Sequence, residues 1–138
     1  MPYPEMLVSP MRAELSNNGF EEPKNSEDVD SAFDNADGTM LLVVNSVCGC
    51  AAGSCRPGVV NSLNNGKRPE KLVTVFAGQD LEAVAKAREN LLPYPPSSPA
   101  VALFKDGKLV HMIERHMIEG RSAQMISDNL KQAYEQYC

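Results

Sequence analysis

The sequence predicts an α/β fold in which helices flank a central mixed sheet on both faces. Two short apolar runs, residues 40–46 and 72–77, are typical of strands, and the first reads as buried on both faces. Two later runs, residues 99–105 and 108–114, flank Asp106-Gly107, a dipeptide that favours a two-residue hairpin turn. From residue 40 the expected order is strand, helix, strand, helix, hairpin, helix, which indicates a parallel sheet with an antiparallel edge.

Two helices are expected before the first strand. Residues 4–18 have an amphipathic pattern that Asn18-Gly19 ends, with apolar residues at every fourth position (Leu7, Met11, Leu15). A second helix is expected from Ser26, a natural N-cap followed by two acidic residues. It would end near residues 37–38 and bury Val29, Ala32 and Phe33. We therefore expect one domain over residues 1–138 whose first 38 residues or so form a helical extension.

Three more helices complete the expected fold. Residues 51–63 predict a helix whose regular part Pro57 and Gly58 kink or delay. Residues 80–92 predict a helix with Leu81, Val84, Ala85, Arg88 and Leu92 along one face, ended by Pro93. Residues 95–99 form a proline-rich linker, and the last helix spans residues 121–137. Its apolar face consists of Met125, Ile126, Leu130 and Tyr134.

Composition and charge exclude several classes of protein. The 138 residues are 43% apolar, enough for a core, and 13 basic against 18 acidic residues leave a net charge of −5. This balance argues against nucleic-acid binding, as does the absence of tryptophan. The longest aliphatic run, residues 40–44, is far too short to cross a membrane. Prolines at positions 2, 4 and 10 are untypical of a signal peptide, so we expect a cytoplasmic protein.

Three of the four cysteines lie within eight residues, which is the strongest functional signal of the sequence. Cys48, Cys50 and Cys55 follow the first strand, and Cys138 ends the chain. Structural disulfides are rare in the cytoplasm, so this clustering points to thiol chemistry or metal binding. Because ligands of open α/β sheets bind at the carboxyl ends of the strands, we expect the site at Cys48.

Cys48 is the expected nucleophile, with Cys50 as the resolving thiol. A cysteine between a strand end and a helix N-terminus meets backbone N–H groups that favour the thiolate, which lowers its pKa from about 8.5. Gly49 permits the turn that brings the two sulfurs together, since a disulfide requires Cα atoms about 4.4–6.8 Å apart. A disulfide in so small a ring should be readily reduced. We therefore predict thiol transfer or disulfide isomerisation rather than strong reduction.

Alternative readings apply to the other candidate residues. The three clustered cysteines with His111 or His116 would offer ligands for zinc or an iron–sulfur cluster, although paired C-x-x-C motifs are absent. Cys55 reads either as a second resolving thiol or as a packed helix residue. Arg56 would either add positive potential near the thiolate or lie solvated at the surface. Cys138 is expected to be incidentally exposed.

Several segments over essentially the whole chain resemble one family. They are residues 1–6 (MPYPEM), 9–12 (SPMR), 45–53 (NSVCGCAAG), 56–57 (RP), 95–99 (PPSSP), 114–116 (ERH) and 118–120 (IEG). In these segments the chain is similar to the bacilliredoxins. The resemblance implies a thioredoxin-like fold with an N-terminal helical extension and a cis-proline beside the active site, which matches Ser98-Pro99.

The resemblance also implies an activity and its partners. It implies removal of bacillithiol from mixed disulfides on cytosolic proteins, with bacillithiol as co-substrate and no bound cofactor. Cys48 would take up the bacillithiol, Cys50 or a second bacillithiol would release it, and a flavoprotein disulfide reductase would keep the pool reduced. Cys55 is an additional thiol that leaves the resolving group open. A protein disulfide isomerase, a metal carrier and a binding module with incidental cysteines remain the competing functions.

Overall fold

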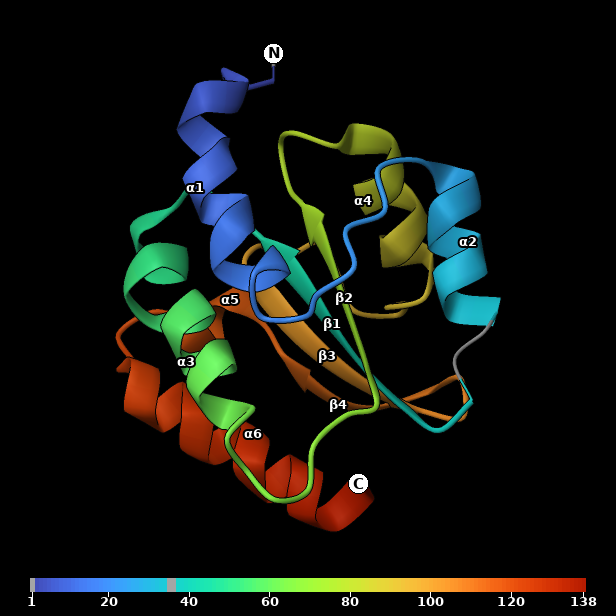
Figure 1. Cartoon of the computed structure of the whole chain (residues 1–138), viewed down its shortest axis with the longest axis vertical. Coiled ribbons are helices and arrows are strands. Elements are labelled where there is room, and N and C mark those ends of the chain that lie inside the picture. Colours follow the sequence, from blue (N-terminus) through green and yellow to red (C-terminus); the bar gives the residue numbers. More distant parts are fainter. Residues whose placement is uncertain (1, 35–36) are drawn as a thin grey trace.

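A four-stranded mixed sheet forms the centre of the computed structural model, which describes residues 2–34 and 37–138 (Figure 1). The strand order is β2-β1-β3-β4, from β1 (Thr39–Asn45), β2 (Lys71–Phe76), β3 (Ala100–Lys105) and β4 (Lys108–Ile113). Strands β1 and β2 are parallel, whereas β3 is antiparallel to both β1 and β4. Asp106 and Gly107 both have positive φ in the β3–β4 turn, so the expected strands and hairpin are confirmed.

Helices cover both faces of the sheet (Figure 1). One face carries α1 (Glu5–Ser16), α3 (Arg56–Ser62) and α6 (Ala123–Tyr137), and the other carries α2 (Ser26–Asp34) and α4 (Leu81–Glu89). Side chains alternate along β1 between the two layers, so Leu41 and Val43 pack toward α3 and α6, and Leu42 and Val44 toward α2 and α4. This alternation explains why every residue of β1 is buried.

The helix after the cysteines begins irregularly, as Pro57 and Gly58 predicted. Residues Ala51–Cys55 form a π-helical turn, and regular α-helix starts only at Arg56. Gly58 then permits a close approach to α6, because a Cβ there would lie 2.7 Å from Ile126 Cβ. A short helix, α5 (Arg115–Ile118), had no counterpart in the sequence prediction.

Three predicted helix faces were partly wrong. In α1 the buried residues are Val8, Arg12 and Leu15, whereas Leu7 is exposed. In α4 the buried residues are Ala83, Val84 and Ala87, whereas Leu81 and Leu92 lie largely exposed. In α6 Met125 is half exposed, although Ile126, Leu130 and Tyr134 are buried as expected. Helix α2 ends at Asp34, and the expected end near residue 37 adjoins positions outside the described residues.

Arg12 explains the error in α1. Its guanidinium pairs with Glu5, Glu22 and Asp80 at 2.6–2.9 Å and lies over the Phe76 ring, 5.4 Å from its centroid. A buried charge needs such partners, and here they come from three separate segments. None of the helices in the described part of the chain is long and apolar enough to cross a membrane.

Candidate active site

The strand register brings four chain segments to one edge of the sheet. Asn45 ends β1 opposite Phe76 of β2, and Val44 pairs with Ala100, the first residue of β3. Val101 in turn pairs with Ile113, the last residue of β4. The cysteine loop after β1, Pro99 before β3 and Arg115 after β4 therefore all lie at this edge. This is the edge at which the sequence predicted the site.

Cys48 and Cys50 form the centre of the site. The loop after β1 turns back at Cys48, whose carbonyl accepts hydrogen bonds from the N–H groups of Ala51 and Ala52 at 3.0 and 3.3 Å. This turn brings the Cys48 and Cys50 sulfur atoms to 2.6 Å from each other, both as free thiols. Both cysteines are partly exposed, so an incoming disulfide reaches them from solvent.

The two thiols differ in acidity. Burial raises the pKa of Cys48, but hydrogen bonds from the Cys50 thiol, from backbone N–H groups and from Ser46 outweigh it and lower the pKa below its ordinary value. Burial, together with the donated hydrogen bond and the negative charge of Cys48, raises the pKa of Cys50 to about 11. Cys48 is therefore the cysteine of the pair that ionises more readily, and Cys50 is the one that retains its proton.

Arg56 holds the loop that carries Cys48. Its side chain is buried, so the reading of a solvated surface arginine was wrong. Its guanidinium donates hydrogen bonds to Asn45 Oδ1 at 3.0 Å, to the Ser46 carbonyl at 2.7 Å and to the Glu14 carboxylate. Ser46 Oγ in turn accepts a hydrogen bond from the Cys48 N–H at 3.2 Å. Arg56 thus connects helix α1 to the cysteine loop.

The opposite side of the site consists of the Pro99 loop and Arg115. The Ser98–Pro99 peptide bond is cis, the conformation that the family resemblance implied. Arg115 donates hydrogen bonds from its backbone N–H to Ser97 Oγ at 2.7 Å and from its guanidinium to the Ser98 carbonyl at 3.3 Å. Its Nε pairs with Glu119 at 2.8 Å. Its positive charge acts on both thiols and lowers the pKa of Cys50 against the larger effects of burial and of Cys48.

The remaining candidate cysteines lie in different surroundings. Cys55 is fully buried, and burial raises the pKa of its thiol to about 12. Cys138 is exposed at the chain end. Gly49 is exposed and has a negative φ, and a Cβ there would have open space around it.

The candidate metal ligands do not converge in the described residues. Within residues 2–34 and 37–138, no three His, Cys, Asp or Glu side chains form a group that could hold a metal ion. His111 on β4 contacts Asn129 Oδ1 at 2.7 Å, and His116 on α5 is mostly exposed. Neither histidine serves as the fourth ligand that the metal-carrier reading needs.

Sequence reasoning missed Glu14, Asn45, Ser46 and Arg115 as parts of this edge. Asn45 and Ser46 carried a signal, because a pair of polar residues directly after a buried strand marks the strand end. Arg115 belonged to a segment that resembled the family, but no role followed from its position. Glu14 carried no signal, because its contact with Arg56 spans 42 residues of sequence.

Comparisons of the sequence with known proteins agree with this geometry. A family model described as "Disulphide isomerase" matches residues 3–138. A bacilliredoxin of Cytophaga hutchinsonii is 62% identical over 134 residues, covering 97% of this chain and 98% of the relative. A bacilliredoxin of Salinibacter ruber is 54% identical over 140 residues, covering 100% of this chain and 82% of the relative.

Solved structures with the same arrangement are thioredoxins. Mitochondrial thioredoxin 3 of Saccharomyces cerevisiae superposes with a TM-score of 0.58 at 14% identity, covering 90% of this chain and 98% of that one. Thioredoxin O2 of Arabidopsis thaliana gives a TM-score of 0.55 at 17% identity, covering 86% and 96%. These neighbours confirm the expected thioredoxin-like fold.

Proposed function

The chain belongs to the bacilliredoxin family, and from that premise we propose how this thiol–disulfide oxidoreductase acts. Its substrates are mixed disulfides between cytoplasmic proteins and bacillithiol or a similar low-molecular-weight thiol. Cys48 is the nucleophile and Cys50 the resolving thiol. The observation that carries the proposal is the 2.6 Å contact between two partly exposed sulfur atoms, of which Cys48 has the lowered and Cys50 the raised pKa.

In the first step the Cys48 thiolate attacks the sulfur of the small thiol on the client protein. The bond between that sulfur and the client cysteine breaks, and a new disulfide joins the small thiol to Cys48. The client cysteine leaves as a thiolate and takes up a proton. The lowered pKa of Cys48 favours this step, because the thiolate is the form that attacks.

In the second step Cys50 releases the small thiol. Once Cys48 is part of a disulfide it carries no negative charge, so two of the causes that raise the pKa of Cys50 disappear. Cys50 then loses its proton and attacks Cys48 Sγ, which forms a Cys48–Cys50 disulfide and frees the small thiol. A second small thiol performs the same release when Cys50 does not. The two electrons that reduced the client come from the cysteine pair, and the reduced thiol pool with its flavoprotein reductase restores them.

The surrounding residues take positioning roles in this proposal. Arg56 holds the Cys48 loop through Asn45 and Ser46, and Ser98 and Pro99 form the opposite wall. Gly49 lies between the two cysteines and is exposed. Cys55 packs in the core instead of resolving, since its buried thiol is protonated at neutral pH.

Intact-mass spectrometry tests these roles directly. Reduced wild type, Cys48→Ala, Cys50→Ala and a Cys138→Ala control are mixed with a model protein that carries bacillithiol on one cysteine. We expect the adduct to accumulate on Cys48 in Cys50→Ala, to stay on the client with Cys48→Ala, and to leave the client with wild type and with the control. If neither wild type nor any variant removes the adduct, and wild type rearranges a scrambled disulfide protein, the chain is a disulfide isomerase instead.

A further inference from the structure

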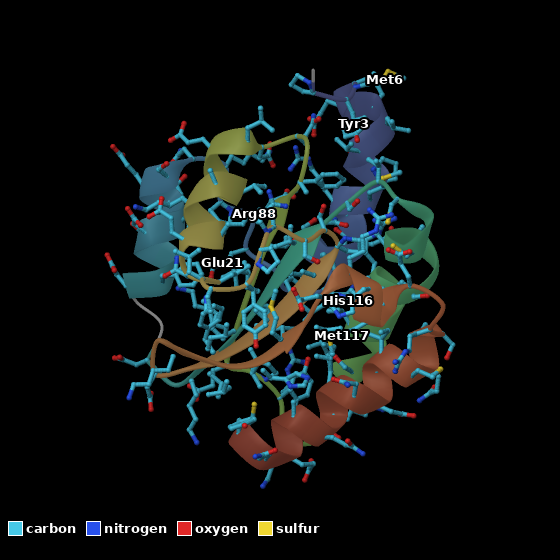
Figure 2. All side chains as sticks on the ribbon, turned by 180° about the vertical axis from the view of Figure 1, so that it is seen from behind. Tyr3, Met6, Glu21, Arg88, His116 and Met117 are labelled. Atoms are coloured by element: carbon cyan, nitrogen blue, oxygen red, sulfur yellow. The ribbon has the colours of Figure 1, made fainter. Side chains whose placement is uncertain are left out.

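A groove of about 480 Å³ is lined by residues of α4, of the loop before β3 and of α5. The proline-rich loop before β3 forms one side of it, including Ser97 and Ser98, and α5 forms the other with Arg115 and His116. Arg88 of α4 lines the same groove, and Figure 2 labels Arg88 and His116. Ser98 lies just before β3 and Arg115 just after β4, so the groove lies at the edge of the sheet that carries the cysteine loop, and the charge of Arg115 acts on both thiols.

Arg88 is a cation without a partner in this groove. Its Nε is the one buried side-chain nitrogen or oxygen without a hydrogen-bond partner among residues 2–34 and 37–138. The side chain is half-buried, and the described residues offer it no ion pair. A buried donor left without an acceptor costs free energy, so an acceptor from outside the chain would remove that cost.

A second arginine and two carboxylates also line the groove. Arg115 forms an ion pair with Glu119, and Glu114 lies 4.0 Å from the His116 ring. The two buried arginines, Arg12 and Arg56, each bind at least one carboxylate. Arg88 differs from them because it lines a groove and has no carboxylate partner among the described residues.

We propose that this groove binds the carboxylate-bearing part of the small thiol on the client, with Arg88 as the residue that selects it. The proposal rests on the proposed function, because it concerns the group that Cys48 takes up. A guanidinium donates paired N–H groups in the geometry of a carboxylate, which makes Arg88 selective for that group over a neutral one. Arg88 acts on substrate binding and leaves the sulfur chemistry to Cys48 and Cys50.

Three mixed disulfides separate this role from the alternatives. The first joins a neutral cysteine peptide to mercaptosuccinate, the second joins the same peptide to mercaptoethanol, and the third joins an acidic peptide to mercaptoethanol. Rates of peptide release are measured with wild type, Arg88→Gln, Arg88→Lys and Arg68→Gln. Arg68 is an exposed control at the opposite end of the sheet. Thermal unfolding checks that every variant folds.

We expect Arg88→Gln to release the peptide from the mercaptosuccinate disulfide about tenfold more slowly than wild type. A loss of this size corresponds to one charge-assisted hydrogen-bonded pair. The two mercaptoethanol disulfides should react at the wild-type rate, Arg88→Lys should recover part of the loss, and Arg68→Gln should change none of the rates. An equal change on all three disulfides, or a loss confined to the acidic peptide, overturns the proposal. If wild type releases none of the peptides, the proposed function itself fails, and the groove role fails with it.

Discussion

Arg56 Nη1 donates a hydrogen bond to Asn45 Oδ1 at 3.0 Å, and both side chains are buried at the end of β1. The same nitrogen also reaches the Ser46 carbonyl, and Asn45 Nδ2 donates to the Met11 carbonyl of α1 at 3.2 Å. A buried cation therefore joins the N-terminal helix, the last residue of the central strand and the loop that carries Cys48. This connection holds the loop that carries Cys48, the proposed nucleophile.

Replacing Arg56 with methionine should destabilise the protein and slow the reaction of Cys48. The Ser46 carbonyl loses the Arg56 donor, and Asn45 Oδ1 retains only the Ser46 N–H of its two donors, so we expect the free energy of unfolding in urea to fall by about 2–4 kcal/mol. The exposed Arg68→Met variant should change it by less than about 0.5 kcal/mol. Equal losses in the two variants would contradict a specific role of Arg56.

The pKa of Cys48 should rise when Cys50 is replaced by alanine. Among the hydrogen bonds that lower the pKa of Cys48, the one from the Cys50 thiol has the largest effect, and alanine has no donor to replace it. The measurement is the rate of Cys48 alkylation by iodoacetamide against pH, because only the thiolate reacts. Cys50→Ser retains a hydroxyl donor and should shift the inflection less. An unchanged inflection in Cys50→Ala would mean that backbone N–H groups alone hold the thiolate.

Cys55 should make the folded protein less stable in alkaline solution. Its ordinary pKa of 9.0 is raised to about 12 by burial, so between these values the unfolded chain releases a proton that the folded chain retains. Stability is then fully present below pH 9 and is lost as pH rises, by about 1.4 kcal/mol per pH unit for this one group.

Urea unfolding of wild type and Cys55→Ala between pH 8 and 11 measures this effect. The alanine variant should lose less stability with rising pH than wild type, although it begins about 1 kcal/mol less stable at pH 8 because of the small cavity. Cys55→Ala should also retain the activity on bacillithiol adducts. It would lose part of this activity if Cys55 were a second resolving cysteine. Parallel pH curves for the two proteins would contradict the buried, protonated thiol.

Local patterns predicted the elements of this fold well because the responsible contacts are near in sequence. Burial on two faces explains the apolar strand at residues 40–46. Positive φ at two adjacent residues explains the turn at Asp106-Gly107. The predicted place of Cys48 followed from the same reasoning, because a strand end locates the crevice.

Helix faces and supporting residues escaped prediction because their contacts are distant. Arg12 lies on the buried face of α1 because Glu5, Glu22 and Asp80 supply carboxylates, and Asp80 is 68 residues away. Arg56 is likewise buried by partners on α1 and β1, which periodicity within its own helix does not reveal. Local patterns miss such buried arginines because the carboxylates and carbonyls that bind them are distant in the sequence.

Gly58→Ala should destabilise the contact between α3 and α6. The new Cβ would lie 2.7 Å from Ile126 Cβ and 2.8 Å from the Ala123 carbonyl oxygen, so the helices must separate. We expect a loss of about 1–3 kcal/mol in the free energy of unfolding. Gly53→Ala is the matched control, because its Cβ meets open space. A Gly58→Ala protein as stable as the control would show that the helices adjust without cost.

Arg115 should speed the resolving step through its charge. Burial and the neighbouring Cys48 raise the pKa of Cys50, and Arg115 opposes them. Without this charge Cys50 ionises less readily, so Arg115→Gln should accumulate the adduct on Cys48 during the reaction. We expect a two- to fivefold slower release, roughly what an exposed and solvent-screened charge contributes.

Quenched-flow sampling with intact-mass detection follows this intermediate over time. Arg115→Lys distinguishes charge from geometry, because lysine retains the positive charge but loses the guanidinium contacts with Ser98 and Glu119. Release at the wild-type rate in Arg115→Lys assigns the effect to charge. Equal slowing in Arg115→Gln and Arg115→Lys would instead mean that Arg115 holds the loop before Pro99. It would do so through the hydrogen bond from its guanidinium to the Ser98 carbonyl at 3.3 Å.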